Sequence, residues 1–181
     1  MSKKISRRDF IKTTAAAGGA AALMPQTIFS SQNKKNLRVG FIGTGLRGQW
    51  MLWLATKYPD VEIPAICDID DGMISAALKI IKDSGRKEPK VYKKNDEDFR
   101  NLVKNEELDG VYIATPWEWH HPMAIAAMKE GIHVGTEVPA ALTVNECWDL
   151  VNISENTGKF CMIMENVCYR RDVMAVLNMV R

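Results

Sequence analysis

Three glycines in the spacing Gly43-x-Gly45-x-x-Gly48 could hold the phosphates of a dinucleotide. They follow a short apolar run and precede a stretch that predicts a helix, so they occupy a strand-to-helix turn. In such a turn one glycine permits the bend, one lets a pyrophosphate approach the backbone, and one allows close helix–strand packing. The free amides at the helix start then bind phosphate oxygens. A simple glycine turn without a ligand is the alternative.

Asp68 supplies the second part of this pattern, because it ends the next predicted strand 20 residues after Gly48. A carboxylate in that place accepts a hydrogen bond from a ribose 2′-hydroxyl and favours NAD over NADP. Arg47 lies inside the turn and complicates the choice, since a nearby arginine can hold the 2′-phosphate of NADP. We predict a dinucleotide site with NAD as its cofactor.

A cluster of aromatic, acidic and imidazole side chains follows the strand predicted at 110–114. Its members are Trp117, Glu118, Trp119, His120 and His121. Ligands of open parallel sheets bind beyond the carboxyl ends of the strands, so this cluster could face a nicotinamide or a sugar. The alternative is that the tryptophans only pack against the next helix. No metal site is predicted, because adjacent histidines point apart and further ligands are missing at a useful spacing.

Polar residues also follow the next two predicted strands. Glu137 and Val138 come after the fifth strand, and Glu165 and Asn166 come after the sixth. Because parallel strands end at one edge of a sheet, these residues would lie along the same edge as the glycine turn. For Glu137 the alternative is a solvated strand end.

Strands and helices alternate along the chain from residue 36 onward. The strands are predicted at 37–42, 63–67, 91–92, 110–114, 133–136 and 160–164. The helices are predicted at 47–57, 73–82, 96–104, 122–129, 143–156 and 170–181. This order calls for an α/β fold, a doubly wound parallel sheet of Rossmann type with helices on both faces. The last helix has no C-cap, so we expect the domain at 36–181 to be truncated at its C-terminal end.

The first 35 residues carry a different kind of signal. The pair Arg7-Arg8 lies in a twin-arginine pattern, and a weakly apolar run follows at 13–24. That run is too short to span a bilayer, which takes roughly 20 residues. A basic start with a short apolar middle predicts a signal peptide, with a disordered basic tail as the alternative. We predict a signal peptide and linker over 1–35, export by the twin-arginine machinery, and a periplasmic location.

The basic charge of the chain belongs to this signal. Residues 1–35 hold seven of the 24 Lys and Arg and one of the 22 Asp and Glu, which leaves 17 basic and 21 acidic residues. A net charge of −4 gives no support for nucleic-acid binding. The cysteines form no C-x-x-C pair, and a protein exported by this route folds in a reducing compartment first. We therefore predict buried free thiols at Cys67, Cys147, Cys161 and Cys168.

Four short motifs resemble the Gfo/Idh/MocA superfamily of dinucleotide-dependent sugar oxidoreductases. They are VGFIGTG at 39–45, ICD at 66–68, ATPxxxH from Ala114, and GTEVP at 135–139. Most members have a lysine after the glutamate of the last motif, and that lysine assists redox chemistry on the sugar hydroxyl. Val138 stands there in this chain, which argues against an ordinary sugar dehydrogenase.

A closer resemblance is to glycoside hydrolase family 109, the NAD-dependent α-N-acetylgalactosaminidases. It is carried by GLRG from Gly45, PWEWHH from Pro116, Glu137-Val138 and the long string at 165–181, and it covers 37–181. Besides the glycine turn, the resemblance implies that NAD is held by Leu46, Arg47, Asp68, Trp117, Glu118, Trp119, His120, Glu137, Val138 and Asn166.

The resemblance further implies an α-N-acetylgalactosaminyl glycan as substrate and NAD⁺ as a catalyst that is not consumed. The 3-hydroxyl would be oxidised, the C2 proton removed, the aglycone eliminated, water added and the ketone reduced. The family's proton-transfer groups lie mostly in a second α+β domain. We expect that domain and the catalytic residues beyond Arg181, and the chain alone to be inactive. The alternatives are an exported sugar oxidoreductase and a truncated dinucleotide-binding module without turnover. The sequence leaves the oligomeric state open, with a homo-oligomer as one possibility.

Overall fold

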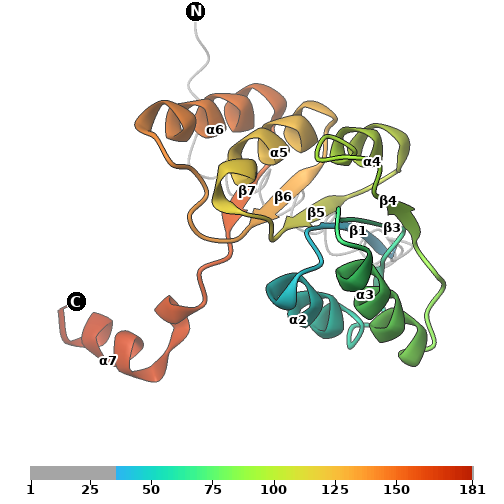
Figure 1. The fold of residues 1–181 in the computed structure, drawn as a ribbon. Coiled ribbons are helices and arrows are strands. Elements are labelled where there is room, and N and C mark those ends of the chain that lie inside the picture. Colours follow the sequence, from blue (N-terminus) through green and yellow to red (C-terminus); the bar gives the residue numbers. More distant parts are fainter. Residues whose placement is uncertain (1–35, 181) are drawn as a thin grey trace, which may run out of the picture. The chain divides into compact units, whose positions relative to one another are not determined.

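The computed structural model describes residues 36–180, which form a parallel sheet between two layers of helices (Figure 1). From one edge to the other the strands are β4 (Lys90–Tyr92), β3 (Ala65–Cys67), β1 (Leu37–Ile42), β5 (Gly110–Ile113), β6 (His133–Thr136) and β7 (Cys161–Ile163). A two-residue strand, β2 (Val61–Glu62), pairs with the start of β1. Every pairing is parallel, and β1 lies inside the sheet between β3 and β5. The predicted doubly wound sheet is confirmed.

Helices cover both faces of the sheet. They are α2 (Leu46–Ala55), α3 (Asp71–Asp83), α4 (Phe99–Asn105), α5 (Trp117–Lys129) and α6 (Val144–Thr157). After β7 come a 3-10 turn, η2 (Val167–Tyr169), and a last helix, α7 (Arg171–Val180), which covers neither face. Successive side chains of a strand point to opposite faces. Phe41 of β1 accordingly packs in a buried cluster with Leu52 of α2, and Ile42 packs in a second cluster with Phe99 of α4. The two hydrophobic cores therefore lie on opposite faces of one sheet.

Helix caps follow the local signals in the sequence. The Thr143 hydroxyl accepts from the Glu146 amide at 3.2 Å, and the Glu146 carboxylate accepts from the Thr143 amide at 2.9 Å. These two bonds form a capping box at the start of α6, where the sequence predicted a helix start. The same helix ends at Gly158, whose φ of 67° favours a residue without a Cβ. At the start of α3, Asp70 accepts from the Met73 amide at 2.9 Å.

The first turns of α5 differ from the prediction. The helix begins at Trp117, whereas the sequence predicted a start at Pro122. Pro116 is the N-cap, and Pro122 lies inside the helix, where its missing amide removes one backbone hydrogen bond. The aromatic and histidine cluster therefore lies on helical turns, and the helix decides which way each side chain points.

The sheet ends in an open edge at β7. Met162 and Ile163 of this strand are 54% and 51% exposed, and every residue of α7 is exposed. The apolar side chains of α7, among them Val176 and Leu177, are uncovered by the described residues. No helix within 36–180, α7 included, is long and apolar enough to cross a membrane.

Candidate cofactor site

A cleft of about 320 Å³ opens beyond the carboxyl ends of β1, β3 and β5. It is lined by Gly43 and Gly45 after β1, Asp68 after β3, and Thr115 and Trp119 after β5. Open parallel sheets bind their ligands at this edge, where the strand order reverses. The fold thus brings residues from three separate stretches of the sequence to one place.

The space around the three glycines suits a ligand that approaches the backbone. A Cβ on Gly43 would lie 2.6 Å from the carbonyl of Ala114, and a Cβ on Gly48 would lie 2.0 Å from the Gly43 oxygen. A Cβ on Gly45 would meet nothing within 4 Å. Two glycines therefore let the turn pack closely, while the third faces open space at the start of α2. That first helical turn carries no acidic side chain, so it fits the phosphates of a dinucleotide.

The Asp68 carboxylate is fixed against this turn. One oxygen accepts from the Thr44 amide at 2.5 Å and the Thr44 hydroxyl at 3.0 Å, and the other accepts from the Asp70 amide at 3.0 Å. Thr44 is fully buried. The carboxylate consequently lines the cleft in the place where a ribose hydroxyl is recognised. Sequence reasoning did not assign Thr44, and its only signal was its position between two of the glycines.

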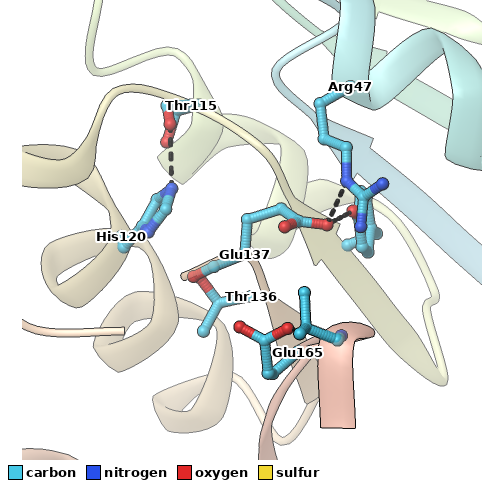
Figure 2. Close-up of polar contacts among 8 residues, drawn as sticks. Arg47, Thr115, His120, Thr136, Glu137 and Glu165 are labelled. Carbon is cyan, nitrogen blue, oxygen red and sulfur yellow. Dashed lines mark hydrogen bonds and ion pairs between the residues drawn. The ribbon is translucent and has the colours of Figure 1, made fainter. Parts of the chain in front are cut away.

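Arg47 points across the sheet, away from Asp68. Its Nε donates to Glu137 Oε1 at 2.6 Å (Figure 2), and this hydrogen bond is the main reason that the pKa of Arg47 is raised. Glu137 follows β6 and Asp68 follows β3, on opposite sides of β1. The guanidinium also lies 5.2 Å from the centre of the Trp50 ring. Arg47 is therefore not placed to bind a 2′-phosphate beside Asp68.

Tyr112 is a residue of this site that sequence reasoning missed. Its hydroxyl donates to the same oxygen of Glu137 that Arg47 binds. The ring is 5% exposed within β5 and lies 5.8 Å from the ring of Phe41, centre to centre. Burial, and then the bond to Glu137, raise the pKa of Tyr112 far above its usual range. The available signal was a phenol inside a buried strand, because such a hydroxyl needs a partner.

His120 is buried, so its ring does not face the cleft. Its side chain is 1% exposed, with Nδ1 2.7 Å from the Pro139 carbonyl oxygen and Nε2 2.8 Å from the Thr115 carbonyl oxygen (Figure 2). The ring thereby joins the turn after β5 to the segment after β6. Any contribution of His120 to cofactor binding would come from holding these two segments, not from contact of its ring.

The other members of the aromatic cluster divide between the cleft and solvent. Trp119 lines the cleft and lies edge-on to Phe99, with 6.1 Å between ring centres. Trp117 is 62% exposed, and Glu118 is exposed beside it. His121 faces α6, where its ring nitrogens lie 4.0 Å from Glu146 and 3.5 Å from Asp149. Of the cluster, only Trp119 forms a wall of the cleft.

Three more predicted residues lie outside the cleft. Leu46 is 86% exposed in the first turn of α2, and Val138 lines a separate apolar hollow beneath α6. Asn166 is exposed just before η2, and the neighbouring Glu165 accepts from the Val167 amide at 2.6 Å. Figure 2 shows Glu165 near Glu137, at the ends of adjacent strands. A role for these residues toward the cofactor stays a prediction.

The described residues also define the state of the thiols. Burial raises the pKa of the Cys67 thiol to about 12, and it also raises the pKa of the half-buried Cys161. Cys147 and Cys168 are exposed, so the prediction of buried thiols is wrong for these two, which lie on helical turns at the surface. Within 36–180, His, Cys, Asp and Glu nowhere gather in a group of three that could hold a metal ion.

The parallel sheet, the open glycine turn and the carboxylate after β3 define a dinucleotide-binding domain of Rossmann type. Residues 37–165 match the profile of the oxidoreductase family with an NAD-binding Rossmann fold, and the chain belongs to this Gfo/Idh/MocA family. Its cofactor is NAD. Residues 4–24 match the signal sequence of the twin-arginine translocation pathway, which lies outside the described residues.

Similar sequences confirm the resemblance to glycoside hydrolase family 109. The chain is 50% identical, over 97% of its length, to a protein from Parabacteroides distasonis named glycosyl hydrolase family 109 protein. It is 49% identical, again over 97% of its length, to a protein from Tannerella forsythia named alpha-N-acetylgalactosaminidase. The chain spans 41% and 42% of the lengths of these two relatives.

Solved structures with the same fold are more distant in sequence. A myo-inositol 2-dehydrogenase from Lactobacillus plantarum matches 81% of the chain with a TM-score of 0.67 at 24% identity. A scyllo-inositol dehydrogenase from Lactobacillus casei, solved with NAD(H) and scyllo-inositol, also matches 81% with a TM-score of 0.67, at 20% identity. The chain covers 41% of each of these proteins. At this level of identity the likeness shows the fold.

Proposed function

We propose that this chain is the cofactor-binding part of an NAD-dependent α-N-acetylgalactosaminidase. The observation that carries the proposal is the turn at Gly45, open toward a cleft that also holds Asp68. The relative named alpha-N-acetylgalactosaminidase supports the substrate class, because it is 49% identical to nearly the whole chain. Since the chain spans 42% of that relative, the activity is proposed for the full-length gene product.

Each group in the cleft then has a physical task. The amides after Gly45 bind the pyrophosphate, and Asp68 accepts a hydrogen bond from the 2′-hydroxyl of the adenosine ribose. Glu137, on the opposite side of β1, would hold the other half of the dinucleotide. Trp119 supplies an apolar wall, and His120 holds the two segments that carry Thr115 and Pro139.

When bound, NAD⁺ would accept the hydride from C3 of the sugar as the 3-hydroxyl becomes a ketone, which acidifies the C2 proton, and the resulting NADH would later return the hydride. The part of the chain described here binds and orients that group. We assign no proton transfer on the sugar to residues 36–180. Residues 1–181 alone should therefore release no aglycone, since a positioned acid or base contributes about 10²–10⁴-fold. Release of a chromogenic aglycone by this chain with NAD⁺ would contradict the assignment.

An exported sugar oxidoreductase is the second candidate, favoured by the oxidoreductase profile that matches 37–165. The full-length gene product separates the two, given p-nitrophenyl α-N-acetylgalactosaminide and catalytic NAD⁺. A glycosidase releases many equivalents of nitrophenol per NAD⁺ while the absorbance of NADH at 340 nm stays flat. An oxidoreductase accumulates NADH in step with sugar oxidation and releases no nitrophenol, which would overturn the glycosidase proposal.

We also propose that the protein is exported through the twin-arginine machinery and acts in the periplasm. The match at residues 4–24 supports this route. Changing both Arg7 and Arg8 to Lys should retain a reporter carrying residues 1–35 in the cytoplasm. Delivery of the double variant to the periplasm at the unaltered rate would contradict the proposal.

A further inference from the structure

The hydroxyl of Tyr112 leaves the hydrophobic core and ends on the Glu137 carboxylate. The rest of the side chain packs in the cluster beneath α2 and α3, with Phe41 and Leu52. A phenylalanine would fill the same apolar space equally well. The polar contacts of the hydroxyl therefore explain its presence: it donates to Glu137 Oε1 and interacts with the Arg47 guanidinium beside it.

The neighbouring strand carries no side chain beside this ring. Gly135 of β6 lies opposite Tyr112 of β5 in the sheet. A Cβ at Gly135 would lie 3.2 Å from the Met164 sulfur and 3.8 Å from Tyr112 Cδ2. A side chain at this position would crowd the Met164 sulfur, whereas Tyr112 would lie at an ordinary contact distance.

Glu137 accepts hydrogen bonds from two side chains on one of its oxygens. Arg47 approaches from the first turn of α2, 2.6 Å away, and Tyr112 approaches from β5. Two donors from different elements fix the carboxylate plane more firmly than either does alone. Within residues 36–180 no hydrogen bond reaches Oε2, so this second oxygen can accept from a ligand.

We propose that Tyr112 is a positioning residue, which together with Arg47 orients Glu137 toward the nicotinamide half of the cofactor. The inference rests on the proposed function. Asp68 marks the adenosine side of the cleft after β3, and Glu137 lies beyond β5 on the other side of β1. The proposal therefore concerns only the half of the dinucleotide that lies over β5 and β6.

The test compares two ligands that differ in that half. Tyr112→Phe should weaken NAD⁺ binding about three- to tenfold. A hydrogen bond to a charged group contributes roughly 10- to 150-fold, and losing the positioning of Glu137 should remove part of that contribution. Binding of ADP-ribose, which lacks nicotinamide, should change less than twofold. Calorimetry on the chain gives both dissociation constants, and a thermal melt checks the fold. Equal loss for both ligands, or no loss, overturns the proposal.

Two further variants sharpen the result. Tyr92→Phe removes a matched hydroxyl, bonded to Glu106 at the other end of the sheet, and should leave both affinities unchanged. Glu137→Gln should also weaken the binding of NAD⁺ but not that of ADP-ribose. Adding Tyr112→Phe to Glu137→Gln should weaken NAD⁺ binding by less than a further factor of two. If the loss of NAD⁺ affinity in the double variant equals the product of the two single losses, the positioning role of Tyr112 is wrong. If the unaltered chain binds neither NAD⁺ nor ADP-ribose, the proposed function itself has failed.

Discussion

Two clusters of the same composition lie at opposite ends of the sheet. At the carboxyl end, Glu137 accepts from Arg47 and Tyr112. At the amino end, Glu106 accepts from Lys90 at 2.9 Å and from the hydroxyl of Tyr92. In each cluster one carboxylate oxygen receives both a cation and a phenol. The chemistry of the three groups therefore does not by itself decide which cluster serves a ligand.

The surroundings of the two clusters decide it. The amino end has the larger hollow, about 840 Å³, but its arginines are bonded to the protein itself. Arg86 donates to the carbonyl oxygens of Tyr58 at 2.5 Å and Thr56 at 3.1 Å, and Arg38 donates to that of Glu107 at 2.6 Å. At the carboxyl end the space beside Gly45 is open at a helix start. Free backbone amides at the strand ends, rather than cavity size, mark the ligand site.

The largest effect that we predict falls on the glycine turn. Gly48→Ala places a methyl 2.0 Å from the Gly43 oxygen, so it should cost about 3 kcal/mol of unfolding free energy, as severe overpacking does. Gly45→Ala, in open space, should change stability by less than about 0.5 kcal/mol yet weaken NAD⁺ binding. Urea titration and calorimetry measure the two quantities. Equal stability losses would show that Gly45 is structural.

Asp68→Ala should come next, with a loss of NAD⁺ affinity of roughly 1.5–3 kcal/mol, the range for hydrogen bonds to charged groups. The change also leaves the buried Thr44 amide without its acceptor. Glu106→Ala removes a carboxylate of the amino-end cluster and should leave affinity unchanged. Calorimetry with NAD⁺ and NADP⁺ provides the check. If the unaltered chain binds NADP⁺ as tightly as NAD⁺, the role of Asp68 is wrong.

The smallest effect concerns the amino-end cluster and stability alone. Burial acts to raise the pKa of Glu106, but the bonds from Tyr92 and Lys90 outweigh it and lower the pKa below 4.5. A lowered pKa stabilises the fold above the unfolded value and loses that contribution as the pH falls through the folded value. Glu106→Gln should therefore cost about 1 kcal/mol at pH 7 and progressively less below pH 4.5. A cost that is independent of pH in urea titrations would contradict this.

The parts of this molecule that depend on neighbours in sequence were predictable. The alternation of strands and helices fixed the sheet class, and the capping box of Thr143 and Glu146 placed the start of α6. The glycine spacing and Asp68 located the cleft, because both belong to one strand–helix–strand unit. In each case a recognisable pattern of residue types marks the structure.

The parts that depend on contacts between side chains of separate elements, which no residue pattern marks, were not predictable. Tyr112 and Glu137 are 25 residues apart, and their bond requires β5 and β6 to be in register. The burial of His120 likewise depends on the Pro139 segment, to which no local pattern points. Pro122 misled the placement of α5, because packing of the helix tolerates the hydrogen bond that proline removes.

The position of β1 inside the sheet has a consequence for the timing of synthesis. Val39 pairs with Gly110, so β1 cannot pair with β5 until the ribosome has added a further 71 residues. At 5–20 residues per second that interval is about 4–14 s. During it an apolar strand has one edge without its native neighbour. The proposed twin-arginine route carries folded proteins, so on that route β1 would gain this neighbour before export.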